Sequence, residues 1–172
     1  MKEGEVNDHL AIAWEYPDQP LEVISAKFSR VELSCAMNLH CGAILDSWTG
    51  ISGDSIADLL FATNDLTSVP NQSTRLTIFL ESPTNIGDNY GSRMKGWLLP
   101  PVTGTYSFWI ASDASGEFWL STDSDRVNKV RVCWLDESVL QYDFTSSTTQ
   151  KSEPITLVAG QAYYYEVRHL LA

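Results

Sequence analysis

The chain has 172 residues, of which 11% are aromatic and 19% charged, and 22 Asp and Glu outnumber 11 Lys and Arg to give a net charge of −11. This length suits one domain with a sizeable core. The acidity argues against a nucleic-acid partner, which needs a basic surface, while it permits bound cations or a merely solvated surface. No stretch approaches the roughly 18 apolar residues of a membrane helix, so no membrane insertion is expected.

The N-terminal part predicts one strand, a weaker arm and a connector. Apolar and small or acidic residues alternate over 9–16, which is typical of a strand. Two prolines follow, and residues up to 31 form a weaker run that we expect to pack as an extended arm. Residues 32–41 are expected to be a connector. The segments are therefore an N-terminal strand and arm (1–31), a connector (32–41) and a β-sandwich body (42–172).

Three cysteines leave the redox compartment open. Cys35 and Cys41 lie in one short polar segment, where they either close a small disulfide loop in an oxidising compartment or remain thiols. Cys133 lies in a strand-like run and is predicted to be a buried thiol.

The body predicts short strands joined by turns. Alternation marks strands at 44–48, 76–80, 93–99, 105–111, 117–121, 130–134 and 157–167, and a short helical turn is expected within 54–60. The strands before and after the polar loop 112–116 are expected to lie side by side as a hairpin. That loop contains Asp113.

The motifs of the body occur in a characteristic order. They are Asn89-Tyr90-Gly91-Ser92-Arg93, Gly96, the run from Pro101 to Phe108, Ser112-Asp113 and Trp119-Leu120-Ser121, with further matches at 42–51 and 159–167. This series resembles the protective-antigen fourteen-kilodalton domain, a β-sandwich of toxins, flocculins, adhesins and glycosidases. The resemblance implies an all-β fold with two antiparallel sheets, jelly-roll-like, and an extracellular or cell-surface location as part of a longer secreted chain.

The order of the segments differs from that family. The sequence from Asp8 to Trp14 resembles the family's final strand, which follows the Tyr-rich strand, yet here it comes first. The resemblance therefore implies a permuted domain, opened at its last hairpin, with His9 and His169 close together. Three explanations stay open: a unit cut out of phase from a tandem array, a circular permutation, or a strand that completes a neighbouring copy. Exchange of the first strand between neighbouring copies can propagate head to tail into a filament.

The loop with Asp113 is the first candidate site. In sugar-binding members of the family, two consecutive aspartates joined by a cis peptide hold a calcium ion that sugar hydroxyls coordinate. Asp113 matches the first aspartate, and Ala114 replaces the second, which removes a charged ligand. Because calcium takes six to eight oxygen ligands, the Ala114 carbonyl remains a candidate ligand. The resemblance implies a sugar site made of Asp113, Ala114 and Ser115, and Trp119 is added as a ring on which a sugar could stack.

A second loop completes the site in lectin-like members. It corresponds here to residues 2–8, so Glu3, Asn7 and Asp8 join Asp113 as candidate calcium ligands. The alternative is a solvated acidic turn.

Two functions are compatible with these features. One is a non-catalytic carbohydrate-binding or adhesion module, calcium-dependent, within a tandem or larger surface protein, with cell-surface or polysaccharide glycans as partners. The other is a structural spacer or self-assembling subunit that exchanges its first strand with copies of itself. An enzyme is not expected, because the chain has no G-x-S-x-G elbow and no carboxylate pair marked out for glycoside hydrolysis.

Overall fold

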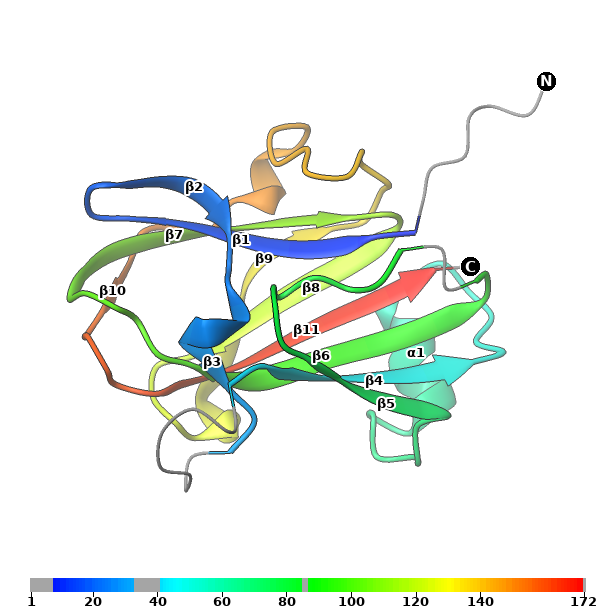
Figure 1. Cartoon of the computed structure of the whole chain (residues 1–172). Coiled ribbons are helices and arrows are strands. Elements are labelled where there is room, and N and C mark those ends of the chain that lie inside the picture. The colour runs from blue at the N-terminus through cyan, green and yellow to red at the C-terminus, as the bar shows by residue number, and fades with distance from the viewer. Residues whose placement is uncertain (1–7, 33–40, 85–86, 172) are drawn as a thin grey trace.

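Two antiparallel β-sheets face each other in the computed structural model, which describes residues 8–32, 41–84 and 87–171 (Figure 1). The small sheet contains, in spatial order, β10 (Ile155–Leu157), β7 (Gly104–Ser112), β1 (Leu10–Tyr16) and β2 (Gln19–Val23). The large sheet contains β5 (Gln72–Leu76), β4 (Ala43–Thr49), β6 (Tyr90–Leu98), β11 (Tyr163–Leu171), β8 (Ser115–Ser121) and β9 (Lys129–Leu135), and β3 (Ser29–Arg30) pairs with one end of β6. The predicted all-β sandwich is confirmed.

The core lies between the inward faces of the two sheets. Trp14 of β1 is completely buried and contacts Tyr106 and Phe108 of β7, with ring centroids 5.4 and 6.4 Å away. Phe108 in turn lies 5.4 Å from Phe118 of the large sheet, so aromatic rings join the two layers. Such ring pairs add about 0.5–1.5 kcal/mol each beyond the burial of their area. Cys133 is also fully buried, as predicted, and burial raises the pKa of its thiol. Cys35 lies outside the described residues, so the disulfide to Cys41 stays a prediction.

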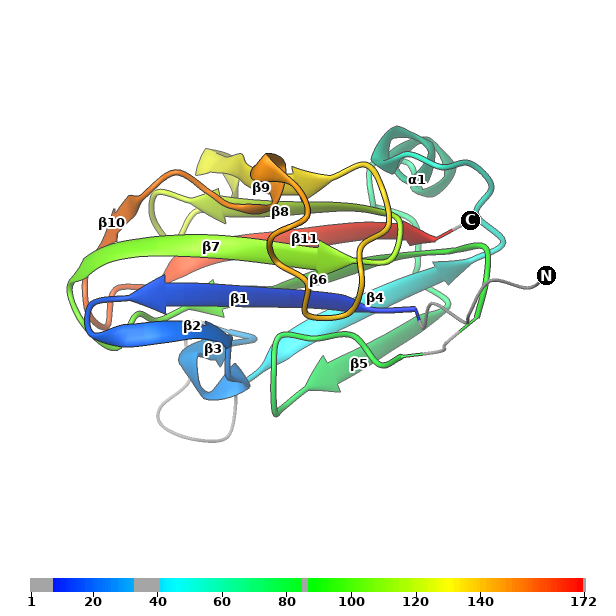
Figure 2. The same cartoon turned by 90° about the horizontal axis from the view of Figure 1, so that it is seen from above.

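The first strand is an internal strand of its own chain. β1 pairs with β7 over six consecutive residue pairs, from Leu10↔Ser112 to Glu15↔Ser107, and with β2 on its other side (Figure 2). It therefore covers the edge that β7 would otherwise expose. β11 belongs to the other sheet, so β1 and β11 do not form the expected hairpin. They nevertheless meet at one end of the sandwich, where β1 begins and β11 ends (Figure 1).

Another expected hairpin is also absent. β7 and β8 follow each other in sequence, yet β7 lies in the small sheet and β8 in the large one. Only Asp113 and Ala114 separate the two strands, and Ala114 has a φ of 77°, so the chain turns across the sandwich instead of folding back beside itself. The expectation failed because alternation tells which face of a strand is buried, and not which strand pairs with it.

The strand predicted at 76–80 lies earlier. β5 ends at Leu76, and the following residues form single bridges with other segments, Ala11↔Glu81 and Ser25↔Phe79. Leu80 is buried, its N–H donates to the Ile24 carbonyl, and its carbonyl accepts from the Ile12 N–H. This segment therefore extends the edge of the small sheet past β2.

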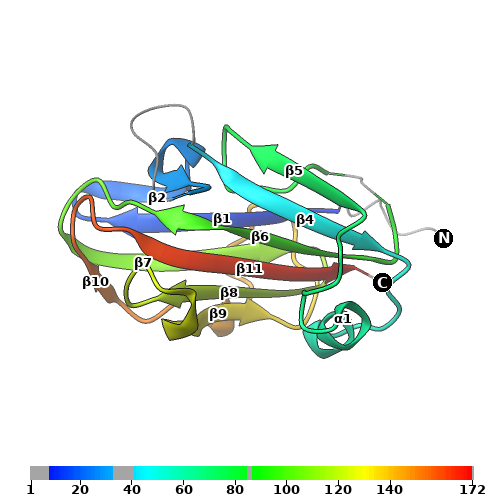
Figure 3. The ribbon, with the colours of Figure 1, turned by 90° about the horizontal axis from the view of Figure 1, so that it is seen from below.

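One helix covers the end of the large sheet's outward face where β11 ends (Figure 3). α1 (Ile56–Thr63) begins at a capping box formed by Ser55 and Asp58, slightly later than the predicted turn. Its Leu59 packs with Trp48 of β4 and Leu170 of β11. Gly91 of β6 allows this close approach, because a Cβ at position 91 would lie 2.2 Å from Leu59 Cδ1. The rest of the outward face is left for other contacts.

Candidate functional site

Asp113 lies where three segments meet. Its N–H donates to the carbonyl of His9, at the start of β1, over 3.0 Å. Its carbonyl accepts a 2.7 Å hydrogen bond from His169 Nε2, near the end of β11. The backbone of the β7–β8 loop thus joins the first and last strands, and the two histidines lie together as predicted.

Asp113 is largely buried as a residue, and its carboxylate has no counter-charge among the described residues. The residue is 7% exposed, and within the described residues its side chain makes no hydrogen bond or ion pair. No described residue engages its carboxylate oxygens, and carboxylate oxygens are ligands that calcium takes. This side chain therefore has capacity for a cation.

Asp8 and Tyr90 lie near this carboxylate. Asp8 is 8% exposed and accepts a 3.0 Å hydrogen bond from the Gly87 N–H. Burial raises the pKa of Tyr90, and the charges of Asp8 and Asp113 raise it further. The Tyr90 hydroxyl is buried without a hydrogen-bond partner in the described part of the chain. Two carboxylates therefore lie near the unsatisfied phenol oxygen at one end of the sandwich, and carboxylate oxygens are among the ligands that calcium takes.

The neighbouring loop residues are held by the protein itself. The Ala114 N–H donates to Ser138 Oγ over 3.1 Å, and the Ala114 carbonyl accepts from Ser112 Oγ over 2.9 Å. A carbonyl has two lone pairs, so that oxygen retains one for a ligand. Ser115 Oγ donates to the Asp54 carbonyl over 2.7 Å. The described peptide bonds are all trans, including the one between Asp113 and Ala114.

Two predicted ligands and one predicted platform are not brought to this site. Glu3 and Asn7 lie outside the described residues. Trp119 lies on the outward face of β8, where its Nε1 donates to Glu117 and the Arg168 guanidinium lies 4.6 Å from its ring. In the ranges that the structure describes, no group of three or more His, Cys, Asp or Glu is arranged to hold a metal. Asp8 and Asp113 would need further oxygen ligands.

Sequence reasoning missed Tyr90 and Ser138. Tyr90 belongs to the motif Asn89-Tyr90-Gly91, which marked the family without suggesting a role for the phenol. Ser138 lies in the polar loop after β9 and contacts Ala114 only through the fold.

Comparison with known proteins identifies the family. The sequence model of the PA14 domain matches residues 63–170. The chain belongs to the PA14 domain family. The resemblance seen in the sequence is therefore confirmed.

The PA14 relatives are much longer chains. The segment is 30% identical over 145 residues to a mouse (Mus musculus) N-acetyl-beta-glucosaminyl-glycoprotein 4-beta-N-acetylgalactosaminyltransferase 1, covering 81% of this chain and 13% of that one. It is 28% identical over 110 residues to fibrocystin of Canis lupus familiaris, covering 59% of this chain and 3% of that one. The family thus occurs in chains named as enzymes and in fibrocystins.

A solved structure shares the fold. The crystal structure of the beta-glucosidase from Kluyveromyces marxianus in complex with glucose superposes with a TM-score of 0.51 and 16% identity, over 85% of this chain and 17% of that chain. At this identity the likeness shows the fold alone. Among the described residues, no helix is long and apolar enough to span a membrane.

Proposed function

We propose that this PA14 domain is a non-catalytic carbohydrate-binding module within a longer extracellular or cell-surface protein. The observation that carries the proposal is Asp113, which is 7% exposed as a residue and whose carboxylate has no counter-charge among the described residues, near Asp8 and the unsatisfied Tyr90 hydroxyl. Family membership adds the context, since similar segments lie in a glycosyltransferase and in fibrocystins.

The residues at this end would hold calcium. Asp113 and Asp8 supply carboxylate oxygens, and the Ala114 carbonyl has a free lone pair. Glu3 and Asn7 are the candidate remaining ligands. When bound, the ion would offer coordination positions to neighbouring hydroxyls of a sugar.

A binding role is favoured over hydrolysis. Glycosidases place two carboxylates on either side of the scissile bond, across a cleft that the substrate enters. Asp8 and Asp113 are instead 8% and 7% exposed, and Asp8 is held by the Gly87 N–H.

The test is glycan binding with and without calcium. The chain is applied to an array of neutral and acidic glycans in millimolar calcium and again in chelator. Asp113→Asn should abolish calcium-dependent binding, because it removes the charge and keeps the shape. Asp18→Asn is the matched control, since Asp18 is an exposed residue in the β1–β2 turn at the far end of β1, with a φ of 62° that asparagine tolerates. Calcium-dependent binding that survives Asp113→Asn would contradict the proposal.

A further inference from the structure

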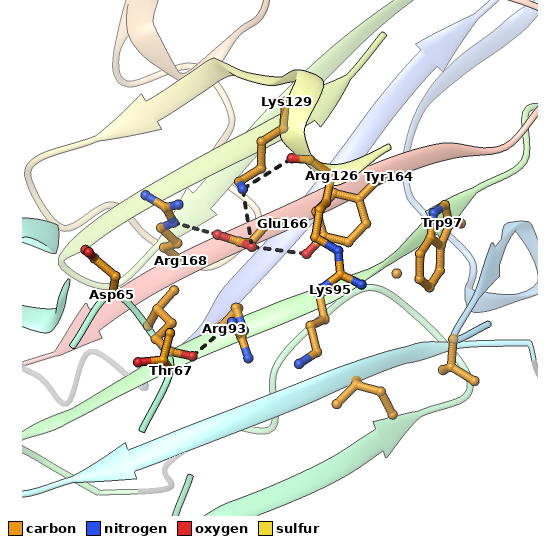
Figure 4. Close-up of a pocket in the computed structure, with 14 residues that line it drawn as sticks. Asp65, Thr67, Arg93, Lys95, Trp97, Arg126, Lys129, Tyr164, Glu166 and Arg168 are labelled. Carbon is orange, nitrogen blue, oxygen red and sulfur yellow. Dashed lines mark hydrogen bonds and ion pairs between the residues drawn. The ribbon is translucent and has the colours of Figure 1, made fainter. Parts of the chain in front are cut away.

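A cavity lies on the outward face of the large sheet. It encloses about 640 Å³ and lies beside the segment that follows α1 (Figure 4). We call it the outer cavity. Its walls come from β6, β11, the loop after α1 and the connection between β8 and β9.

Strand register creates the outer cavity. Met94 and Leu98 of β6 point into the core, so Arg93, Lys95 and Trp97 point outward. On β11 the outward residues are Tyr164, Glu166 and Arg168, and each is paired directly with one of those three. Six large side chains therefore stand as three neighbouring cross-strand pairs.

The outer cavity concentrates positive charge in an acidic protein. Five of the chain's 11 Lys and Arg line it: Arg93, Lys95, Arg126, Lys129 and Arg168. A net charge of −11 does not explain why five cations lie side by side in one cavity.

The carboxylates of this region are outnumbered. Asp46 lies 2.8 Å from Arg93 Nη2 and 2.7 Å from Lys95 Nζ. Glu166 lies 2.8 Å from Arg168 Nε and 4.0 Å from Lys129 Nζ. Each of these two acids thus serves two cations, and Arg168 Nη1 also lies 3.7 Å from Glu117 Oε2. The five cations are partly or fully exposed, and an anionic ligand would offset their mutual repulsion.

Two donors remain unused. Arg126 has no carboxylate partner among the described residues, and its guanidinium lies 5.8 Å from the Tyr164 ring (Figure 4). Arg93 Nε is buried and lacks a hydrogen-bond acceptor in the described ranges.

Aromatic rings form one wall of the outer cavity. Trp97 and Tyr164 lie edge to face, with centroids 5.5 Å apart and planes at 65°. Each ring is fixed by a polar atom: Trp97 Nε1 donates to the Ser124 carbonyl, and the Tyr164 hydroxyl donates to Glu166 Oε2. Tyr164 is 4% exposed, so the partly exposed Trp97 is the ring of this pair that can meet the C–H face of a sugar. The volume falls within the range of small-molecule sites.

We propose that the outer cavity binds an acidic sugar, a saccharide that carries a carboxylate or a sulfate, independently of calcium. Arg126 and Lys129 would pair with the acid group, and Trp97 would pack against the ring. An extended polyanion fits poorly, because the cavity also holds Asp65 and Glu166 and the rest of the surface is acidic. The outer cavity is separate from the calcium site, since Arg168 points outward from β11 while its neighbour His169 is buried at Asp113.

The experiment is calorimetric or NMR titration of the whole chain in chelator. The probes are glucuronate, N-acetylglucosamine 6-sulfate and two neutral counterparts, glucose and N-acetylglucosamine. We expect at least one acidic probe to bind, its neutral counterpart to bind at least tenfold more weakly, and the binding to weaken as salt is raised. Whether the carboxylate or the sulfate probe binds identifies the acid group.

Variants tie the binding to the cavity. Arg126→Gln removes a charge that supports no ion pair with another described residue, so folding should be retained while affinity for the acidic probe falls about tenfold. Lys27→Gln is the control, because Lys27 also lies over a ring, 4.6 Å from Phe28, but outside the cavity. Trp97→Leu should weaken binding, and Asp113→Asn should leave it unchanged.

Four results would overturn the proposal. They are equal binding of acidic and neutral sugars, no binding of either acidic probe, full affinity in Arg126→Gln, or loss of binding in Asp113→Asn. Loss of binding in Asp113→Asn would mean that the acidic probe binds at the proposed calcium site and not in the outer cavity.

Discussion

His169 Nε2 donates a 2.7 Å hydrogen bond to the carbonyl of Asp113, and this bond fixes which ring nitrogen of a completely buried histidine carries a proton. Since a carbonyl only accepts, Nε2 carries the proton. Nδ1 has no partner in the described part of the chain, so a second proton there would be a buried, unsatisfied donor. The junction between the first and last strands therefore depends on a neutral His169.

Stability should fall as the pH drops below neutral. Burial lowers the pKa of His169, and the nearby Asp113 only partly opposes this. Below about pH 6.5 the unfolded chain gains a proton that the folded chain does not, which costs at most about 1.4 kcal/mol per pH unit. The loss ends once the pH lies below the folded pKa as well.

Urea unfolding between pH 7.5 and 5.5 measures this slope, and His169→Gln should flatten it. Glutamine keeps an N–H donor for the Asp113 carbonyl and does not titrate. An unchanged slope in His169→Gln would assign the pH dependence to another group.

Asp46 should be one of the residues most sensitive to truncation. It is 4% exposed and accepts from Arg93, Lys95 and Ser73. Burial alone would raise its pKa, but these hydrogen bonds outweigh burial and lower it. Its contribution is therefore present above about pH 4 and lost as the pH falls further. Asp46→Ala should cost about 3 kcal/mol at pH 7, because it leaves two cations without their acid.

The measurement is the free energy of unfolding in urea at pH 7. The control, Asp18→Asn, should have a free energy of unfolding within about 0.5 kcal/mol of that of the natural sequence. A cost of Asp46→Ala below about 1 kcal/mol would mean that solvent screens these pairs.

Gly91 and Leu59 should be energetically coupled. Gly91→Ala places a methyl group against Leu59 and should destabilise by about 1–3 kcal/mol through overpacking. Leu59→Ala alone should cost about 2–5 kcal/mol through the space that it leaves. In the double variant the new methyl occupies part of that space, so the total should be less than the sum. If the double variant loses as much free energy of unfolding as the two single variants together, the two sites are not coupled, and α1 moves away from β6 without cost.

The domain should remain monomeric. β1 makes six pairs with its own β7 and lies between two strands, so exchange with another copy would break and re-form the same contacts with no gain. Sedimentation over a hundredfold range of concentration should give a mass of 19.2 kDa throughout. Mass that rises with concentration would favour the alternative of a self-assembling subunit.

Most strands could be predicted from the sequence, and their partners could not. The alternation of Tyr106 and Phe108 correctly predicts a buried face, yet the same pattern cannot show that β7 pairs with β1 while β8 pairs with β11. Partner choice depends on the two-residue turn at Asp113, whose left-handed Ala114 is not a residue that marks such a turn.

The Asp113 loop was found from its family motif, whereas the outer cavity was missed. Its cations come from separate segments that only the β6–β11 register brings together. A Trp within a strand is by default expected to pack in the core, so Trp97 alone does not signal a site. The available signal was the alternation of Arg93, Lys95 and Trp97. These residues lie on one face of the strand, and a face that carries two cations is expected to point away from the core.

Thermal unfolding with calcium and with chelator tests the central claim most directly. A ligand that binds only the folded state raises the melting temperature, by an amount that corresponds to about 2.7 kcal/mol at a hundredfold excess over its dissociation constant. We predict a rise with millimolar calcium in the natural sequence and in Asp18→Asn, and none in Asp113→Asn. Equal melting temperatures in calcium and in chelator for the natural sequence would contradict a calcium site at Asp113.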